Sequence, residues 1–413
     1  MNNIPVMLPY FDGDELNEVE KVLASGWVAQ GSKVAEFEQM VARYENVGYG
    51  VATTSCTTAL HLALLALGVN ENHDCIVPSF TFTASPNAVL YTGATPIFAD
   101  VSKDTYNLDP ESVEQIIKQQ YNDHLINKQT GKKLKAIMAV SLFGLPADLP
   151  RINKMANHYG LVVLQDSACA FGAKIGEKME AEFGNMSCLS FHPRKSITTG
   201  EGGMILTDDP EKAAYMKTLR SHGATISEID RHRQAGYLMP NFNELGYNYR
   251  MTDIQAAVGV AQMRKMDFIT GQRREKASFY DHLIKEMQID FLIAPQVPET
   301  YYHTYQSYVC VMDMKQLGFV SGDMDDIQKA SDFRNEIMGK LDALGIASRV
   351  GTHATHLLQH YKDRYDLTAD ICPVSYMLDG LSITLPLYVQ MTAEDQVNVL
   401  ETLLTVTKQL MRR

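Results

Sequence analysis

The apolar positions between about residues 48 and 210 fall into short β-rich runs, separated by stretches with helical spacing. Short runs bounded by turn residues are typical of buried strands, and the stretches between them are typical of helices that cover a sheet. Strands are expected at residues 49–54, 74–78, 135–142, 161–166, 186–191 and 203–208. Helices are expected at residues 57–68, 110–121 and 149–160. This alternation predicts an α/β fold with a large, mostly parallel sheet.

The pattern changes after about residue 250. Apolar spacing predicts one long helix over residues 252–285 and another over 326–344, with a short apolar run between them. We interpret this part as a smaller α+β unit. We therefore expect a large domain over residues 1–255 and a small C-terminal domain over 256–413. The polar segment 119–135 is interpreted as an exposed insertion before a strand.

The composition excludes several classes of protein. A chain of 413 residues with 45% apolar content is long enough for a large core. A formal net charge of −12 disfavours a nucleic-acid partner, which would require a basic face. The N-terminus lacks a signal-peptide pattern, and the longest apolar stretch, at residues 60–69, is far short of the roughly 20 residues that a membrane span needs. We expect a soluble protein with no membrane partner.

The cysteines and histidines narrow the chemistry further. The six cysteines are far apart and form no CxxC pair, so the pattern suggests neither a disulfide framework nor a zinc site. His61, His192 and His222 show no ligand spacing with one another, and no metal is expected. A reducing compartment, the cytoplasm, is the natural location.

The stretch SFHPRKSITTGEGG, at residues 190–203, is the most informative part of the sequence. It follows a predicted strand, places Lys195 in a turn and ends in glycines that allow a ligand to approach the backbone. A lysine with a fixed amine is a covalent nucleophile toward a carbonyl, and Ser190 can donate its hydroxyl to a phosphate. Taken alone, a lysine in a loop is more often a solvated charge, and this alternative stays open here.

Asp166 ends the apolar strand LVVLQD. A carboxylate at the end of a buried strand is costly unless a cation or hydrogen-bond donors pair with it. A protonated pyridine nitrogen would be such a cation, and its protonation would make the ring an electron sink. The alternative is that Asp166 caps a helix that follows it.

Two further segments carry candidate binding residues. Thr57 and Thr58 lie in the first turn of a predicted helix, where backbone amides, the helix dipole and two hydroxyls suit a phosphate. Ordinary capping of that helix by Ser55 or Thr57 is equally compatible. Phe82 follows the strand DCIVP and is placed to stack on an aromatic ligand, although an aromatic residue there is more often core.

These residues belong to blocks that resemble the DegT/DnrJ/EryC1/StrS group of sugar aminotransferases over nearly the whole chain. That group is a branch of the fold type I enzymes that depend on pyridoxal 5'-phosphate (PLP), which have the aspartate aminotransferase fold. The matching blocks are ASGWVAQGSKVAEFEQ, SCTTALHLALLALGV, PSFTFTASPNAVLYTGATPIFADV, SLFGLPAD, QDSACAFGA, SFHPRKSITTGEGGMILTDD, LRSHG and LGYNYRMTDIQAAVGVAQ. A match of so many blocks in the same order is very improbable by chance.

The resemblance implies a role for each candidate residue. Lys195 would be the Schiff-base lysine, and Asp166 would pair with the pyridine nitrogen of PLP. Phe82 would stack on the ring. The remaining residues would bind the cofactor phosphate, and these are Thr57, Thr58, Ser190 and Asn248. Because Asn248 would come from the partner subunit, the resemblance implies a homodimer with shared active sites.

The resemblance also implies a reaction. L-glutamate would donate its amino group to a nucleotide-linked keto sugar in a ping-pong mechanism, and the best-fitting subgroup aminates C4 of 4-keto-6-deoxyhexoses, the perosamine synthase type. Amination at C3, a PLP sugar dehydratase and a non-catalytic regulator are the alternatives. One departure is Cys169, which stands where many members have a glutamine. Segment 348–356 is where we expect sugar or nucleotide recognition to differ between members.

Overall fold

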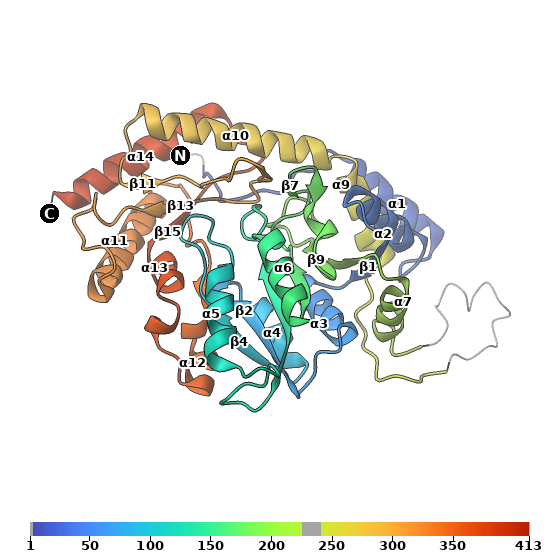
Figure 1. Cartoon of the computed structure of the whole chain (residues 1–413). Helices are drawn as coiled ribbons and strands as arrows, with labels where there is room; N and C mark the ends of the chain where they lie inside the picture. The colour runs from blue at the N-terminus through green and yellow to red at the C-terminus, as the bar shows by residue number, and fades with distance from the viewer. Residues whose placement is uncertain (1–2, 225–240, 413) are drawn as a thin grey trace.

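A computed structural model describes residues 3–224 and 241–412 of the chain. A seven-stranded sheet forms its centre, in the order β1-β10-β9-β6-β5-β2-β4 (Figure 1). The strands are β1 (Tyr49–Thr53), β2 (His73–Pro78), β4 (Thr95–Ala99), β5 (Lys133–Val140), β6 (Val162–Asp166), β9 (Met186–Ser190) and β10 (Gly203–Thr207). All six predicted strands are therefore present. The strand β4 was missed because it has Pro96 at its second position, where proline is unusual in a strand.

The predicted parallel character of the sheet is confirmed. The pairs β9–β6, β6–β5, β5–β2 and β2–β4 are parallel, whereas β10 runs antiparallel to both of its neighbours. Every strand except β10 consequently points the same way, and the carboxyl ends of six strands meet at one edge. Ligands of open α/β sheets bind beyond this edge.

Alternate residues of each strand enter different cores. In β5, Ala136, Met138 and Val140 belong to one apolar cluster, and Ile137 and Ala139 belong to another. A sheet buried on both faces requires helices on both sides. The helices of the first cluster are α3 (Cys56–Ala66), α4 (Ala84–Tyr91) and α7 (Pro210–Leu219), and those of the other face are α5 (Pro110–Gln120), α6 (Leu149–Tyr159), α2 (Ser32–Tyr44) and α9 (Asp253–Met263).

The C-terminal part has its own antiparallel sheet, in the order β11-β13-β15 (Leu292–Ile293, Tyr308–Met312 and Ser382–Leu385). Long helices pack on it, namely α10 (Met266–Glu286), α11 (Met324–Ala343) and α14 (Ala393–Met411). The N-terminus lies against this part, because Ile4 bridges to Ile346 (Figure 1). Shorter elements are α12 (Gln359–Tyr365), α13 (Pro373–Leu381), β7 (Lys174–Ile175), β8 (Lys178–Met179) and β12 (Tyr301–Tyr302).

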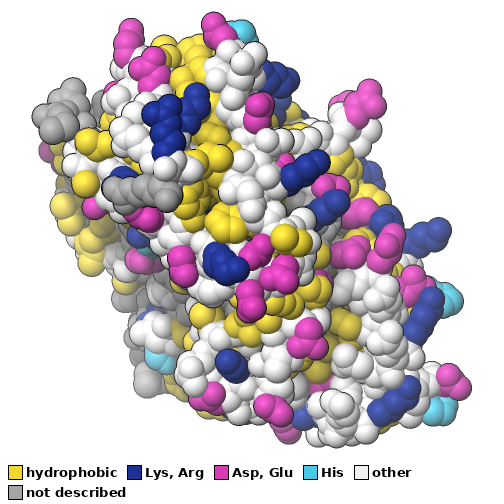
Figure 2. Space-filling view, turned by 90° about the vertical axis from the view of Figure 1, so that its left-hand side faces the viewer, with side chains coloured by type: hydrophobic (Ala, Val, Ile, Leu, Met, Phe, Trp, Pro, Cys, Tyr) yellow, Lys and Arg dark blue, Asp and Glu magenta, His cyan; other side chains and the backbone are white. Residues whose placement is uncertain are grey.

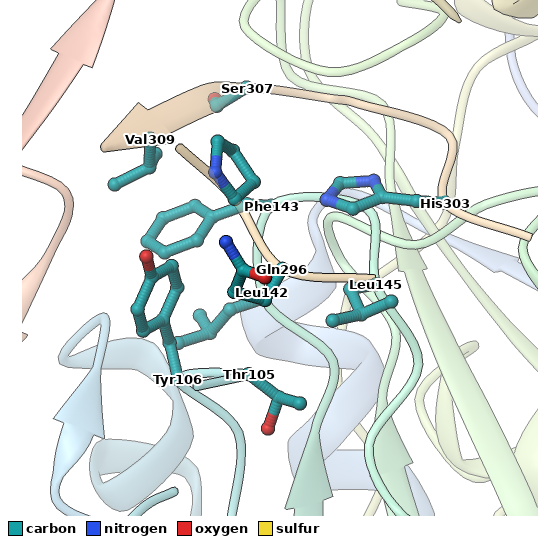
Figure 3. A pocket seen from close by; sticks show the side chains of 10 residues that line it. Thr105, Tyr106, Leu142, Phe143, Leu145, Gln296, His303, Ser307 and Val309 are labelled. Carbon is teal, nitrogen blue, oxygen red and sulfur yellow. The ribbon is translucent and has the colours of Figure 1, made fainter. Parts of the chain in front are cut away.

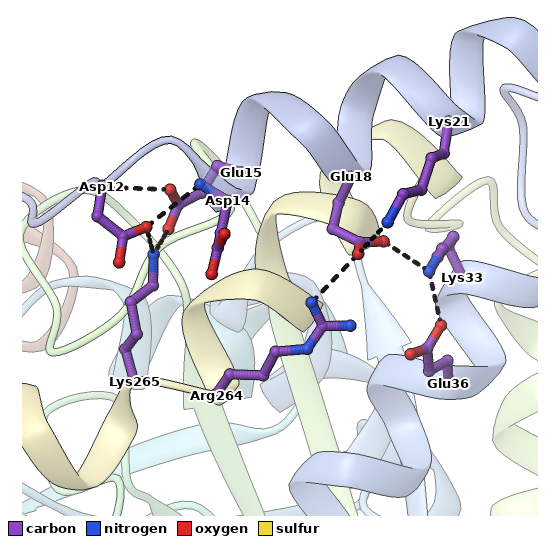
Figure 4. Close-up of polar contacts among 9 residues, drawn as sticks. All are labelled: Asp12, Asp14, Glu15, Glu18, Lys21, Lys33, Glu36, Arg264 and Lys265. Atoms are coloured by element: carbon purple, nitrogen blue, oxygen red, sulfur yellow. Dashed lines mark hydrogen bonds and ion pairs between the residues drawn. The ribbon is translucent and has the colours of Figure 1, made fainter.

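The single long helix predicted over residues 252–285 is wrong, because the chain breaks between α9 and α10. The break carries two basic side chains that bind helix α1 (Asp14–Ser25), as Figure 4 shows. Lys265 Nζ lies 2.5 Å from Glu15 Oε1, and Arg264 Nη1 lies 3.1 Å from Glu18 Oε1. These ion pairs join residues far apart in the sequence, so helical periodicity could not reveal them. The domain boundary expected at residue 255 falls within α9 and stays a prediction.

The interpretation of residues 119–135 as an exposed insertion is also wrong in part. The segment folds back through an antiparallel bridge between Tyr121 and Asn127, and both side chains are buried. The Tyr121 hydroxyl and the Asn127 amide each donate to Asp74 Oδ2 at 2.9 Å. The buried carboxylate of Asp74 thus anchors the segment under the sheet.

The surface of the molecule is mixed in charge. On the side that carries α11 and α14, acidic and basic side chains are interspersed among apolar ones (Figure 2). Across residues 3–224 and 241–412, none of the helices combines the length and the apolar character that crossing a membrane requires.

Candidate active site

The predicted site residues gather at the carboxyl edge of the sheet. Asp166 is the last residue of β6 and Ser190 is the last residue of β9, the neighbouring strand. Lys195 lies in the loop between β9 and β10, and β10 begins at Gly203. A Cβ atom on Gly203 would lie 2.4 Å from the backbone carbon of Ser55, so only glycine allows α3 to start this close to the loop.

Lys195 points back toward the sheet rather than into solvent. Its Nζ lies 3.1 Å from the Sγ of Cys169, which follows β6 by three residues. Burial by itself lowers the pKa of the Lys195 ammonium, but Cys169, Cys56 and Asp166 together raise that pKa above its ordinary value. The solvated-charge alternative does not describe this side chain. Cys169, which stands where many family members have a glutamine, is the residue that contacts the lysine.

Asp166 is buried and held in one orientation. Its Oδ2 accepts a hydrogen bond from Ser85 Oγ at 2.7 Å, and its Oδ1 accepts one from the backbone N–H of Ala168 at 3.2 Å. Burial raises the pKa of the Asp166 carboxyl, and these hydrogen bonds and the charge of Lys195 oppose the rise. The residues that follow Asp166 form turns, not a helix, so the capping alternative is wrong.

Helix α3 presents its N-terminus at the same edge. Ser55 is the N-cap: its Oγ accepts from Thr58 N at 3.2 Å, and Thr58 Oγ1 in turn accepts from Ser55 N at 3.1 Å. This reciprocal capping box occupies the Thr58 hydroxyl. The Thr57 hydroxyl has no partner among the described residues. Of the two threonines, Thr57 is thus the one whose hydroxyl is open to an anion.

Two other predicted residues have exposed side chains. Phe82 follows the short strand β3 (Phe80–Thr81) and is 65% exposed, which is unusual for a phenylalanine beside a buried strand. Asn248 is exposed, and its side chain has no hydrogen-bond partner within the described part of the chain. The roles assigned to both residues stay predictions.

Sequence reasoning missed Ser85, which holds the Asp166 carboxylate. Its hydroxyl also lies 3.0 Å from Thr81 Oγ1, so a short polar chain from β3 fixes the carboxylate. Ser85 is fully enclosed in the first turn of α4, and a small hydroxyl residue at such a position gives no sequence signal beyond ordinary helix capping.

A narrow cleft where the two parts of the chain meet lies apart from these residues (Figure 3). Tyr106 and Phe143 line it from the loops that follow β4 and β5, and His303 and Val309 line it from the C-terminal part. Phe143 has a φ of 60°, and its carbonyl accepts a hydrogen bond from Ser307 N at 3.2 Å. None of the predicted site residues lines this cleft, which marks a contact between the two parts.

The side chains at the sheet edge match the reactive parts of PLP. The Lys195 amine suits its aldehyde, the buried Asp166 carboxylate suits its ring nitrogen, and the open amides and Thr57 hydroxyl of α3 suit its phosphate. The fold and the site fit a PLP-dependent aminotransferase with the aspartate aminotransferase fold. More particularly, the sequence pattern of the DegT/DnrJ/EryC1/StrS aminotransferase family matches residues 9–404, and the chain belongs to this family.

Similar proteins agree with this assignment. The chain is 35% identical to GDP-perosamine synthase of Caulobacter vibrioides over 396 residues, 95% of each chain. It is 33% identical to GDP-perosamine synthase of Escherichia coli O157:H7 over 404 residues, 98% of each chain. Among solved structures, Spr1654 from Streptococcus pneumoniae in its PLP-form is 26% identical, with a TM-score of 0.85 and coverage of 98% of this chain and 99% of that one.

Proposed function

We propose that this enzyme transfers the amino group of L-glutamate to C4 of a nucleotide-linked 4-keto-6-deoxyhexose. The observation that carries the proposal is the similarity to two GDP-perosamine synthases over nearly their whole length. The site supports it, since a lysine stands at position 195 beside a buried carboxylate. Transfer to C3 of a 3-keto sugar is the second candidate.

Each side chain has a task in this proposal. Lys195 Nζ would hold the cofactor covalently and, once released, would carry a proton at that nitrogen. Asp166, oriented by Ser85, would keep a proton on the ring nitrogen. The amides at the start of α3 and the Thr57 and Ser190 hydroxyls would hold the phosphate. When bound, PLP supplies a conjugated ring that withdraws electrons from the carbon bearing the amino group.

We also propose that the active sites are shared within a homodimer. Support comes from large apolar side chains that one chain leaves exposed, since Phe242 and Leu245 are 60% and 86% exposed and Phe82 is 65% exposed. Burying such side chains against a second subunit would remove them from water. Asn248, on the same segment as Leu245, would reach the phosphate of the partner's cofactor.

The six free cysteines favour a cytoplasmic location.

A substrate panel tests the reaction. The enzyme is incubated with L-glutamate and GDP-, dTDP- and UDP-linked 3-keto and 4-keto sugars, and product masses and 2-oxoglutarate are measured. We expect an amino sugar from a 4-keto substrate, matched by 2-oxoglutarate, and none with Lys195→Ala. Amination of 3-keto sugars alone would favour the second candidate. A changed sugar without 2-oxoglutarate would indicate a dehydratase, and no turnover by a PLP-loaded protein would indicate a regulator.

A further inference from the structure

The surroundings of Asp166 include a second buried carboxyl, that of Glu180. Glu180 begins a short 3-10 helix after β8, and its side chain is enclosed. Its Oε1 accepts hydrogen bonds from Ser141 Oγ at 2.6 Å and from Ser167 Oγ at 2.8 Å. Ser167 directly follows Asp166, and Ser141 N donates to the Asp166 carbonyl at 3.0 Å. Glu180 therefore connects the two segments that border Asp166.

The two carboxyls differ in how their oxygens are hydrogen-bonded. Both oxygens of Asp166 accept a hydrogen bond, one from Ser85 Oγ and one from Ala168 N. In Glu180 only Oε1 accepts, while Oε2 is buried and has no hydrogen-bond partner among the described residues. A buried charged oxygen without a donor is far more costly than a neutral hydroxyl. This geometry favours a charged Asp166 and a neutral Glu180.

The charges around the two carboxyls act in the same direction. Burial raises the pKa of the Asp166 carboxyl, and the charge of Lys195 opposes the rise. Burial raises the pKa of Glu180 to about 7, and the negative charge of Asp166 adds to the rise. Glu180 has no basic ion-pair partner in the described part of the chain, and the other acidic groups of this region are Glu45 and Glu182. Like charges in one buried region do not both ionise easily, so the pair keeps one proton, on Glu180.

We propose that Glu180 stores a proton in the cofactor-free enzyme and releases it when a cationic ring nitrogen pairs with Asp166. The inference rests on the proposed role of Asp166 as the partner of the ring nitrogen of PLP. The positive charge on the ring cancels the charge of Asp166, which is one cause of the raised pKa of Glu180, so that pKa falls. The O–H bond of Glu180 then breaks, and its proton leaves to solvent. Because Glu180 acts on the cofactor only through Asp166, it is a positioning residue.

Proton release on cofactor binding tests the proposal. The cofactor-free wild type and Glu180→Gln are titrated with PLP in a calorimeter at about pH 6.5, in buffers with different enthalpies of ionisation, which gives the protons released per site. Below a pKa of about 7, Glu180 carries a proton in most molecules, so the wild type should release up to about one proton more than Glu180→Gln. The substitution keeps an oxygen that can accept from Ser141 and Ser167, and it cannot ionise.

An analogue of PLP in which a CH group replaces the ring nitrogen is the matched ligand control. No cation then pairs with Asp166, and the wild type should release no more protons than Glu180→Gln. The same excess release with both ligands would overturn the proposal, and so would no excess with PLP. Glu45→Gln is the matched variant: burial raises the pKa of Glu45 too, but its hydrogen bond comes from Gly172 N. It should release as many protons as the wild type.

Infrared spectroscopy of the wild type gives a readout that does not depend on the folding of a variant. The C=O stretch of a protonated carboxyl should weaken when PLP is added and persist when the analogue is added. An unchanged band with PLP would overturn the proposal. A Glu180→Gln protein that unfolds at lower temperature, binds both ligands more weakly to the same extent and releases as many protons as the wild type would show a purely structural role, and would also overturn it.

Asp166→Asn separates this inference from the role on which it rests. If the wild type exceeds Glu180→Gln in proton release and Asp166→Asn releases as many protons as the wild type, Asp166 does not pair with the ring nitrogen, and both proposals fail. If Asp166→Asn slows the reaction of the PLP-loaded enzyme with L-glutamate, but the wild type and Glu180→Gln release equal numbers of protons, the inference alone fails. The sugar substrate is decided independently by the substrate panel.

Discussion

The floor and the rim of the active site differ in how completely one chain builds them. The floor side chains, Asp166 and Lys195, are held by neighbours from their own chain, including Ser85 and Cys169. We define the rim as Phe82 and Asn248, whose side chains are exposed. The fold therefore holds in place the two side chains that we propose for covalent attachment and ring binding. In our proposal, a second copy of the chain completes the rim.

The largest effect expected is that of Lys195→Ala, which removes the nucleophile of the floor. Turnover should fall by several orders of magnitude, because the same nitrogen holds the cofactor and carries the proton. The fold should survive, since no hydrogen bond of the Lys195 side chain other than that to Cys169 is lost. Turnover and the circular dichroism spectrum are measured together, and near-normal transamination by a folded variant would refute the assignment.

Asp166→Asn tests the floor more gently, because it keeps the shape and removes the charge. The half-reaction of the PLP-loaded enzyme with L-glutamate, measured without any sugar, should slow roughly 100-fold or more. This is a typical cost of losing one oriented electrostatic group. Cofactor retention should change much less, and Ser85→Ala, which loosens the carboxylate without removing it, should have a smaller effect. Rates equal to those of the wild type would show that the carboxylate plays no part in the chemistry.

The sequence predicted the two reactive side chains of the floor, but not the neighbours that hold them. Apolar runs fix where strands end, and in a parallel sheet those ends share one edge, so Asp166 and Lys195 were found together. Ser85 was missed because its role depends on Asp166, 81 residues away.

The same limit applies to the fold. Local periodicity predicted six of the seven strands of the large sheet and the helices α3, α5, α6 and α11. At the break, Arg264 and Lys265 bind carboxylates of α1 about 250 residues earlier in the chain. In the same way, the buried Tyr121 and Asn127 bind Asp74, 47 and 53 residues earlier. Long-range ion pairs and hydrogen bonds leave no periodic trace in a sequence.

Thr57 and Thr58, both in the first turn of α3, provide a matched pair of variants. Thr57→Val removes a hydroxyl without a protein partner, so cofactor should dissociate more readily while the apoprotein keeps its stability. Thr58→Val breaks the capping box and should lower the free energy of unfolding by about 1 kcal/mol. Dialysis of the cofactor and denaturant unfolding of both variants distinguish them. The reverse pattern would assign the phosphate to Thr58.

The smallest effect expected is a change in how stability depends on pH, and it concerns the carboxyl of Glu45. Glu45 is buried, and burial raises its pKa to about 8, with Glu180 and Glu182 nearby adding to the rise. A raised pKa in the folded state means that stability is present at low pH and is lost as the pH rises toward about 8. Glu45→Gln, which can still accept from Gly172 N, should lose stability less steeply across this range. Exposed Glu177→Gln is the control, and equal slopes for Glu45→Gln and the wild type would contradict the assignment.

Subunit complementation tests most directly whether the floor of one chain needs the rim of another. A heterodimer of one Lys195→Ala chain and one Asn248→Ala chain is prepared, with its composition confirmed by mass, and its transamination is compared with that of each mutant homodimer. If Asn248 serves the partner's cofactor, one site carries both defects and the other carries neither, and roughly half of the activity of two intact sites should return. No regain of activity in confirmed heterodimers would mean that each chain completes its own site, and would contradict the shared active site.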